Sequence, residues 1–489
     1  MKSLVKFNFK FIKPNQKVMG KVNKNIFILA LITALAVCAS VFIPQPVLLT
    51  TQGWNTFIIF LATIACLILN PFPMGVITFL AIVSCIMTDS ISSNKALEGF
   101  GQSIVWLVVC AFFIARTVIN TGLGTRIAYF FISRFGQTPI GVAYSIIFTE
   151  LCISPMIPSA TSRGGGIIYP IAKSVIEGYA TTIHHGQKKI GEFFTMICLH
   201  SNIITSTMFL TAMAGNPIAQ KLAGSLGVEI TWSNWAQAAV IPGLISLILL
   251  PLTVGLFCKL PTGLDNKLIV QNAKDGLKNL GRMTKNELIT TGTFIGLITL
   301  WIFEKQIGVS ATTTAMLGVC LLLLAGVLTW NDIINEKSAW DIFIWFSILV
   351  TIANSLSEQQ VTVWMGNIVS ASLDGYTPVF TAIIVCVGLF FGHYMFASVT
   401  VYFTAMYSVF LKTFLDLGLP PLASAYSLVI AIMLSSGFTH YGISSAPVYF
   451  SGGYMTVKQW WKKSFGITVS VAMIWVIICI AWWSIIGWI

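Results

Sequence analysis

The stretch Pro155-Met-Ile-Pro-Ser-Ala-Thr-Ser-Arg-Gly-Gly-Gly-Ile-Ile-Tyr-Pro-Ile-Ala-Lys173 interrupts an apolar region with residues that end helices. Its prolines and glycine triplet free backbone groups, and the hydroxyl and guanidinium groups between them add hydrogen-bond donors where hydrocarbon is expected. The apolar runs on either side are each short for a bilayer crossing. Because unwound polar backbone is tolerated at membrane depth only beside protein or a water-filled cavity, we predict a re-entrant hairpin whose tip lines a binding site.

A second interruption of the same kind lies at Gly392-His-Tyr-Met-Phe-Ala-Ser-Val-Thr400. Superposing Ser159-Ala-Thr161 on Ser398-Val-Thr400 gives an offset of 239 residues, close to half of the 489-residue chain. A broken hydrophobic segment follows each tip, with the first break expected at Gly215-Asn-Pro217 and the second between 435 and 447. Interrupted segments at matching places in two halves are typical of secondary transporters.

The composition is that of a polytopic membrane protein. Hydrophobic residues make up 56% of the chain and charged residues only 9%, whereas soluble domains carry about 25% charge. The net charge of +12 comes from basic residues in short loops, so we predict contact with the lipid bilayer and no nucleic-acid partner. The ten cysteines stand singly in apolar runs without a Cys-x-x-Cys motif, which argues against disulfides and zinc sites. We expect no metal site and no cofactor.

The hydropathy pattern predicts an all-α fold of about 11 transmembrane helices plus two re-entrant hairpins. Four units are expected: a basic segment with the first helix (1–53), a first repeat (54–258), a cytoplasmic linker (259–286) and a second repeat (287–489). The hairpins are placed at 139–175 and 378–414, and the broken helices at 193–226 and 423–454. An odd number of crossings in each repeat makes the second repeat inverted, so the hairpins enter from opposite faces.

The loop charges predict the orientation. With the amino terminus in the cytoplasm, the basic segments 121–138, 188–189, 259–287 and 458–463 all lie inside. The loops 45–53, 225–236 and 356–377, which contain no lysine or arginine, lie outside. We therefore expect a multi-pass protein of the inner or plasma membrane with its carboxyl terminus outside.

Each tip places hydroxyl groups at the start of a half-helix, where free N–H groups and the positive end of the helix dipole favour an anion. We assign Ser159 and Thr161 to one carboxylate of a small substrate, and Ser398 and Thr400 to the other. The alternative is that these hydroxyls bond back to their own helices.

Cationic side chains lie next to both tips. We expect Arg163 and His393 to contribute positive charge that a bound dianion neutralises, which would slow the return of an empty carrier and enforce exchange. Glu150 and Lys173 lie about equally far from the first tip, so they either form an ion pair or reach separately to the membrane edge. His200 is expected to be a packed, hydrogen-bonded residue.

The motifs around the tips resemble those of the divalent anion/sodium symporter family, the INDY-type carriers of di- and tricarboxylates. The likeness is closest to the bacterial citrate:succinate, tartrate:succinate and 2-oxoglutarate:malate antiporters. The similar motifs are Pro158-Ser-Ala-Thr161, Gly164-Gly-Gly-Ile-Ile-Tyr-Pro-Ile-Ala-Lys-Ser174, Thr207-Met-Phe-Leu-Thr-Ala-Met-Ala214 and Thr439-His-Tyr-Gly442.

This resemblance implies a homodimer and an elevator motion of the hairpins and broken helices against a scaffold. Sodium-dependent members of the family carry Ser-Asn-Thr at each tip, whereas Ala160 and Val399 replace the asparagine here, a departure that argues against sodium coordination. The predicted substrate-binding set also includes Ala160 and Val399 at the tips, and Thr207 and His440 in the broken helices.

We therefore predict obligatory exchange of di- or tricarboxylates such as malate, succinate, 2-oxoglutarate or citrate, with sodium- or proton-coupled symport as the alternative. Asn202, Asn216 and the backbone carbonyl groups at the breaks are candidate sodium ligands. An enzyme is disfavoured because the chain has no His-Glu-x-x-His and no Gly-x-Ser-x-Gly motif. The glycine triplet lacks the Lys-Ser/Thr of a phosphate-binding loop, which argues against an ATP-driven pump. A channel would repeat its filter across subunits rather than invert it within one chain.

Overall fold

The computed structural model describes residues 16–180, 187–261, 264–373 and 375–489. These residues form helices and helical turns with no strand. Eight helices in the described ranges are long and apolar enough to cross a membrane, and three further apolar helices are shorter. The chain is thus the all-α, polytopic membrane protein that the sequence predicts.

One order of elements occurs twice along the chain. After α1 (Gln16–Phe42), the first set is α2 (Thr51–Leu69), α3 (Met74–Met87), α5 (Ser103–Thr121), α6 (Leu123–Phe135), α7 (Pro139–Ile153), α8 (Ala160–Arg163), α9 (Tyr169–Ala180), α10 (Gln187–Met208), α11 (Gly215–Gly224) and α12 (Trp232–Phe257). The second set is α14 (Lys285–Ile302), α16 (Ala311–Leu324), α18 (Lys337–Glu358), α19 (Val361–Ser372), α20 (Pro378–Gly392), α21 (Val399–Asp416), α22 (Pro421–Ser435), α23 (Ala446–Phe450) and α24 (Val457–Ile485). Short helices α4 (Ser93–Ala96), α15 (Glu304–Ile307) and α17 (Trp330–Asn335) connect the longer ones.

The two hairpins have matching local structure at the 239-residue offset. In both, the first arm begins at a proline preceded by a capping threonine, a 3-10 turn follows the arm, and a serine caps the second arm. The matched pairs are Pro139 and Pro378, Ser154 and His393, and Ser159 and Ser398. Proline at the first helical position and a hydroxyl at the cap are strong local helix starts, so short-range sequence determines this pattern.

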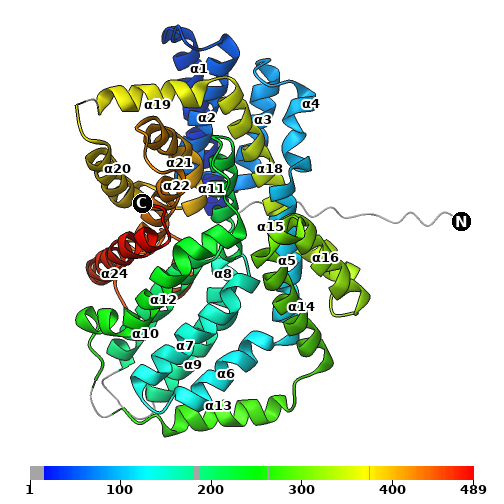
Figure 1. The fold of residues 1–489 in the computed structure, drawn as a ribbon, viewed down its shortest axis with the longest axis vertical. Coiled ribbons are helices and arrows are strands. Elements are labelled where there is room, and N and C mark those ends of the chain that lie inside the picture. The colour runs from blue at the N-terminus through cyan, green and yellow to red at the C-terminus, as the bar shows by residue number, and fades with distance from the viewer. Residues whose placement is uncertain (1–15, 181–186, 262–263, 374) are drawn as a thin grey trace, which may run out of the picture.

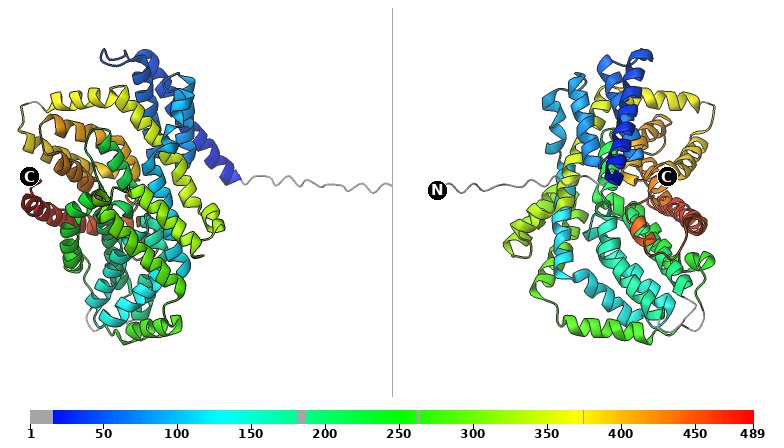
Figure 2. Two further views of the ribbon diagram at one scale, coloured as in Figure 1. Left: turned by 45° about the vertical axis from the view of Figure 1, so that its right-hand side comes forward. Right: turned by 180° about the vertical axis from the view of Figure 1, so that it is seen from behind.

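The helices form two groups that lie side by side in Figure 1. One group contains α2, α3, α5, α14, α16 and α18, and the other contains the two hairpins with α10, α12, α22 and α24. Figure 2 shows the same division from two other directions. In the chain, α6 leads from α5 into the first hairpin and α19 leads from α18 into the second, so each connects the two groups.

Two elements differ from the expectation. The linker was expected to be a hydrophilic loop, but it contains the amphipathic helix α13 (Lys267–Leu280), which packs along α6 and buries Ile269 and Ala273. The first broken helix was expected to break at Gly215-Asn-Pro217, but α10 ends at Met208 and these three residues start α11. Proline fits the first turn of a helix because no intrahelical acceptor awaits its missing N–H, so here it begins a helix rather than ending one.

Candidate functional site

The first tip, residues 154–163, unwinds between α7 and α8. A 3-10 turn ends at Met156, the backbone is extended at Ile157 and Ser159, and Ser159 caps α8 by accepting a hydrogen bond from the Ser162 amide (3.1 Å). A π-helical turn over Gly164–Ile168 then joins α8 to α9. Such wide turns often occur at functional sites.

The second tip, residues 393–402, repeats this geometry. The backbone is extended at Phe396 and Ser398, and Ser398 caps α21 by accepting a hydrogen bond from the Val401 amide (3.4 Å). Ser398 is half-buried, and Thr400 is 8% exposed. Each tip is thus an extended segment that leads into a capped helix start.

Unused hydrogen-bond donors gather at both helix starts. Within the described residues, the amides of Ala160, Thr161, Val399 and Thr400 have no hydrogen-bond partner, and neither do the hydroxyl groups of the two threonines. The capping hydroxyls act as acceptors, which leaves the O–H of Ser398 free to donate. Free amides, hydroxyl donors and the positive end of a helix dipole together favour a negatively charged group.

Arg163 lies behind the first tip and is fully buried. Its Nε donates to Glu150 Oε1 (2.7 Å), Nη1 donates to the carbonyl groups of Ile157 (2.6 Å) and Ala212, and Nη2 donates to Ser206 Oγ (2.6 Å). The guanidinium therefore connects the first arm, the tip and the broken helix formed by α10 and α11. Its predicted role as a substrate ligand stays a prediction.

The partner of Glu150 differs from the one considered from the sequence. Glu150 pairs with Arg163, whereas Lys173 lies 3.9 Å from Glu177 on the surface of α9, where both side chains are more than half exposed. An ion pair between Glu150 and Lys173 is therefore wrong, and Glu150 does not reach to the membrane edge because it is fully buried.

His393 occupies the corresponding place behind the second tip. It is fully buried, its Nε2 donates to the Gly442 carbonyl (2.9 Å), and its Nδ1 lies 3.1 Å from Ser435 Oγ. Gly442 and Ser435 belong to the broken helix formed by α22 and α23. Each tip is thus fastened to the broken helix of its own set by one buried side chain, and a substrate contact for His393 stays a prediction.

A chain of polar contacts connects the first tip with the second broken helix. Asn202 Nδ2 lies 3.3 Å from the Ala160 carbonyl, and Asn202 Oδ1 accepts a hydrogen bond from Ser445 Oγ (2.8 Å). Ser445 lies three residues after Gly442, the acceptor of His393. In addition, α11 packs closely against α21, where a Cβ atom on Gly215 would lie 3.2 Å from the ring of Phe403. Figure 1 places α8 and α11 near the middle of the molecule.

The remaining predicted residues have protein partners. Thr207 is buried in α10, and its hydroxyl donates to the Ile203 carbonyl of the same helix (2.9 Å). His440 accepts a hydrogen bond from Trp461 Nε1 (3.2 Å) within an aromatic cluster in the second break. His200 contacts the Met196 carbonyl (3.0 Å) and the hydroxyl of Thr468 in α24 (3.2 Å), which confirms its expected packing role.

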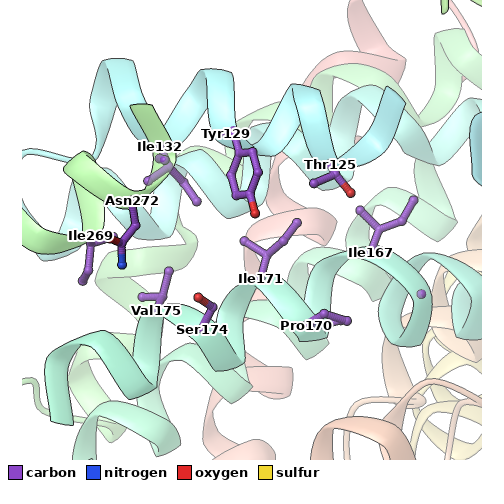
Figure 3. A pocket seen from close by; sticks show the side chains of 12 residues that line it. Thr125, Tyr129, Ile132, Ile167, Pro170, Ile171, Ser174, Val175, Ile269 and Asn272 are labelled. Atoms are coloured by element: carbon purple, nitrogen blue, oxygen red, sulfur yellow. The ribbon is translucent and has the colours of Figure 1, made fainter. Parts of the chain in front are cut away.

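A separate cavity of about 170 Å³ lies between α6, α9 and α13. Figure 3 shows Thr125 and Tyr129 of α6 on one side of this cavity and Ile171 and Ser174 of α9 on the other. Among the described residues, none of the hydroxyl groups at the two tips lines it, and none of its lining residues is cationic. The cavity is therefore distinct from the anion-binding arrangement at the helix starts.

The comparisons with known proteins show the family of the chain. The sequence profile of a family described as the sodium:sulfate symporter transmembrane region matches residues 23–489. The chain belongs to the divalent anion/sodium symporter family. Membership in this family confirms the resemblance drawn from the tip motifs and identifies the protein as a membrane transporter rather than an enzyme.

Relatives in the divalent anion/sodium symporter family cover nearly the whole chain. A putative malate transporter of Bacillus subtilis, YflS, is 40% identical over 475 residues, covering 97% of this chain and 99% of that protein. The chloroplastic dicarboxylate transporter 1 of Arabidopsis thaliana is 37% identical over 451 residues, covering 91% of this chain and 81% of that protein. The crystal structure of the YdaH transporter of Alcanivorax borkumensis shares the fold, with a TM-score of 0.52 and 11% identity over 96% of this chain and 99% of that one.

Three residues have a connecting role that the sequence did not predict. Glu150, Asn202 and Ser445 join the first tip to both broken helices, although they are far apart in the chain. A buried carboxylate within an apolar run was the available signal, because such a group needs a partner inside the protein. The partner of Glu150 could not be predicted without knowing the path of the backbone at the tip.

Proposed function

We propose that this protein exchanges di- or tricarboxylates across the inner or plasma membrane by obligatory antiport. The supporting observation is the pair of helix starts, with unpartnered amides at Ala160, Thr161, Val399 and Thr400 and free threonine hydroxyls. One carboxylate would bind at each start, with the hydroxyl groups of Ser159 and Ser398 contributing donors.

The substrate class is supported by the relatives. One is named for malate and another for dicarboxylates, and both cover more than nine-tenths of this chain. Malate, succinate, 2-oxoglutarate and citrate all carry two or more carboxylates, one for each helix start under this proposal. A monocarboxylate would leave the donors of one start unpaired, which lowers its affinity.

The coupling follows from the state of the donors in the empty carrier. Glu150 neutralises the charge of Arg163. Movement of the empty carrier is therefore slowed by its unpaired amides and hydroxyls rather than by a full positive charge. Moving unpaired donors through an apolar environment costs about 1–3 kcal/mol for each group. A bound dianion satisfies them, and the loaded carrier therefore moves faster than the empty one.

The alternative is sodium- or proton-coupled symport of the same anions. Two buried oxygen atoms at the breaks, Asn216 Oδ1 and Thr439 Oγ1, have no hydrogen-bond partner in the described structure. Oxygen atoms are the ligands that a hard cation such as sodium takes. Against this alternative, Ala160 and Val399 supply no side-chain oxygen at the tips, and both atoms of the Asn202 amide are already bonded.

We further propose an elevator motion. The hairpins, α10, α12, α22 and α24 would move as one body against α2, α3, α5, α14, α16 and α18, with α6 and α19 as the connecting arms. The inverted orientation of the second repeat and a cytoplasmic amino terminus rest on the loop charges. A homodimer rests on the family resemblance.

Counterflow in proteoliposomes tests the proposal. Vesicles loaded with unlabelled malate should accumulate external labelled malate, and the same vesicles without internal carboxylate should not, with or without a sodium or proton gradient. Competition by succinate, 2-oxoglutarate, citrate and tartrate then ranks the substrates. Uptake into empty vesicles that requires a sodium or proton gradient would favour symport, and no uptake of any of these acids would refute the substrate class.

A further inference from the structure

The carboxylate of Glu150 is the centre of a buried polar network. Glu150 lies near the end of α7 and is 0% exposed, and all of its side-chain hydrogen bonds with described residues are to one oxygen, Oε1. Oε1 accepts hydrogen bonds from Arg163 Nε (2.7 Å), Asn202 Nδ2 (2.7 Å) and Thr205 Oγ1 (3.3 Å). A buried carboxylate is stable only with partners of this kind, so its position and theirs are mutually determined.

Two partners of this carboxylate, Arg163 and Asn202, contact different parts of the candidate site. Arg163 ends α8, the helix whose start carries the free donors, and also reaches Ser206 and the Ala212 carbonyl in the first broken helix. Asn202 lies beside the Ala160 carbonyl and accepts a hydrogen bond from Ser445 in the second broken helix. One carboxylate therefore connects four segments: the first arm, the tip and both broken helices.

We propose that Glu150 is a positioning residue for the substrate, which holds the start of α8 to both broken helices through Arg163 and Asn202. This proposal rests on the proposed carboxylate transport. Arg163 serves as the counter-ion of Glu150, and the anion is bound by amides and hydroxyls that this network fixes in place. The ion pair is neutral, so it adds no net charge to the body that moves.

Variants of the ion pair separate this role from direct substrate binding by Arg163. Glu150→Gln leaves Arg163 charged but without its counter-ion. If Arg163 bound the substrate, this variant would bind malate as tightly as wild type or more tightly. Under the positioning role, the tip loosens and the KM for malate exchange rises at least about tenfold, with a smaller change in the maximal rate.

The double variant gives the second comparison. Arg163→Gln alone should also raise the KM, because it leaves a buried carboxylate unpaired. Glu150→Gln combined with Arg163→Gln removes both charges and keeps hydrogen-bonding side chains at both positions. Partial recovery of the KM relative to each single variant is expected for positioning, whereas a double variant no better than Arg163→Gln would overturn the proposal.

Matched controls come from the same hairpin. Lys173→Gln and Glu177→Gln alter the exposed pair on α9 and should change the KM by less than about twofold.

Ser445→Ala keeps the ion pair and removes only the hydrogen bond between Asn202 and the second broken helix, so a raised KM is expected there too. This variant also serves if a charge variant is not recovered as monodisperse protein, and an unchanged KM in Ser445→Ala would then overturn the proposal.

The assay is counterflow of labelled malate in proteoliposomes, with all variants compared as monodisperse protein. Wild-type protein that moves none of the five acids named above would overturn the transport proposal itself. Wild-type exchange with an unchanged KM in Glu150→Gln would overturn only the positioning role.

Discussion

The glycine triplet after the first tip offers a test of the packing between the first hairpin and α23. A Cβ atom built on Gly164 would lie 2.6 Å from the hydroxyl oxygen of Tyr449 and 3.0 Å from its Cζ. Tyr449 is 1% exposed, so its ring has little room to shift. The same atom on Gly165 would lie 3.5 Å from Val448, and on Gly166 it would meet no described residue within 4 Å.

These distances predict opposite effects for neighbouring substitutions. Alanine normally stabilises a helical position by about 0.5–1 kcal/mol relative to glycine, and Gly166→Ala should show this gain. Gly164→Ala forces an overpacked contact that costs about 1–3 kcal/mol, so after the helix gain a net loss of up to about 2.5 kcal/mol is expected. The apparent melting temperatures of the purified variants in detergent should therefore rank Gly166→Ala at or above wild type and Gly164→Ala below it.

Tyr449→Phe provides the matched rescue. The Tyr449 hydroxyl has no hydrogen-bond partner among the described residues, so its removal alone should not lower the melting temperature. In combination with Gly164→Ala, it removes the nearest clashing atom and should recover part of the lost stability. A Gly164→Ala protein that melts at or above Gly166→Ala would refute the packing argument.

Three further predictions concern the hydroxyl groups at the tips, the hydroxyl group of Thr207, and an ion pair between α6 and α14. Thr161→Val and Thr400→Val each remove a free hydroxyl while keeping side-chain shape, and should raise the KM for malate at least about tenfold in counterflow, because hydrogen bonds to charged groups are worth about 1.5–3 kcal/mol. Thr207→Val, whose hydroxyl already serves its own helix, should change that KM by less than about twofold. Arg126 of α6 forms an ion pair with the buried Glu287 of α14 (2.6 Å between Nε and Oε1). Arg126→Ala leaves Glu287 without this partner and should destabilise the protein by about 3 kcal/mol in denaturant unfolding. Adding Glu287→Gln should restore part of this loss.

The sequence allowed the hairpins to be predicted because their signals are local. Proline and a capping threonine start each first arm, and a serine caps each second arm, so the repeated pattern needs no long-range information. Helix α13 was missed for a different reason. Membrane spans are visible as long apolar runs, whereas α13 has a buried stripe that includes Ile269 and Ala273 within an otherwise charged segment.

The partner of Glu150 could not be predicted, because it depends on the path of the chain at the tip. Counting equal distances along two regular arms places Lys173 opposite Glu150. The real arms are not regular: a 3-10 turn and an extended segment precede α8, and a π-helical turn over Gly164–Ile168 follows it. Arg163 is therefore the basic residue that meets Glu150, and Lys173 lies on the surface.

Because Glu150 pairs with Arg163 rather than with Lys173, the physical basis of the proposed coupling changes. Two unpaired cations beside the tips would bind any strong anion through charge alone, and such binding depends little on the geometry of the ligand. Arg163 is instead paired with Glu150, and both ring nitrogens of His393 have protein partners, so under the proposed function the substrate meets two sets of directed donors. Directed donors discriminate by the distance between carboxylates, because a ligand that reaches only one helix start leaves the other unpaired. Selectivity among dicarboxylates should therefore follow from how rigidly the two starts are held, which is the role that the structure offers to Arg163 and His393.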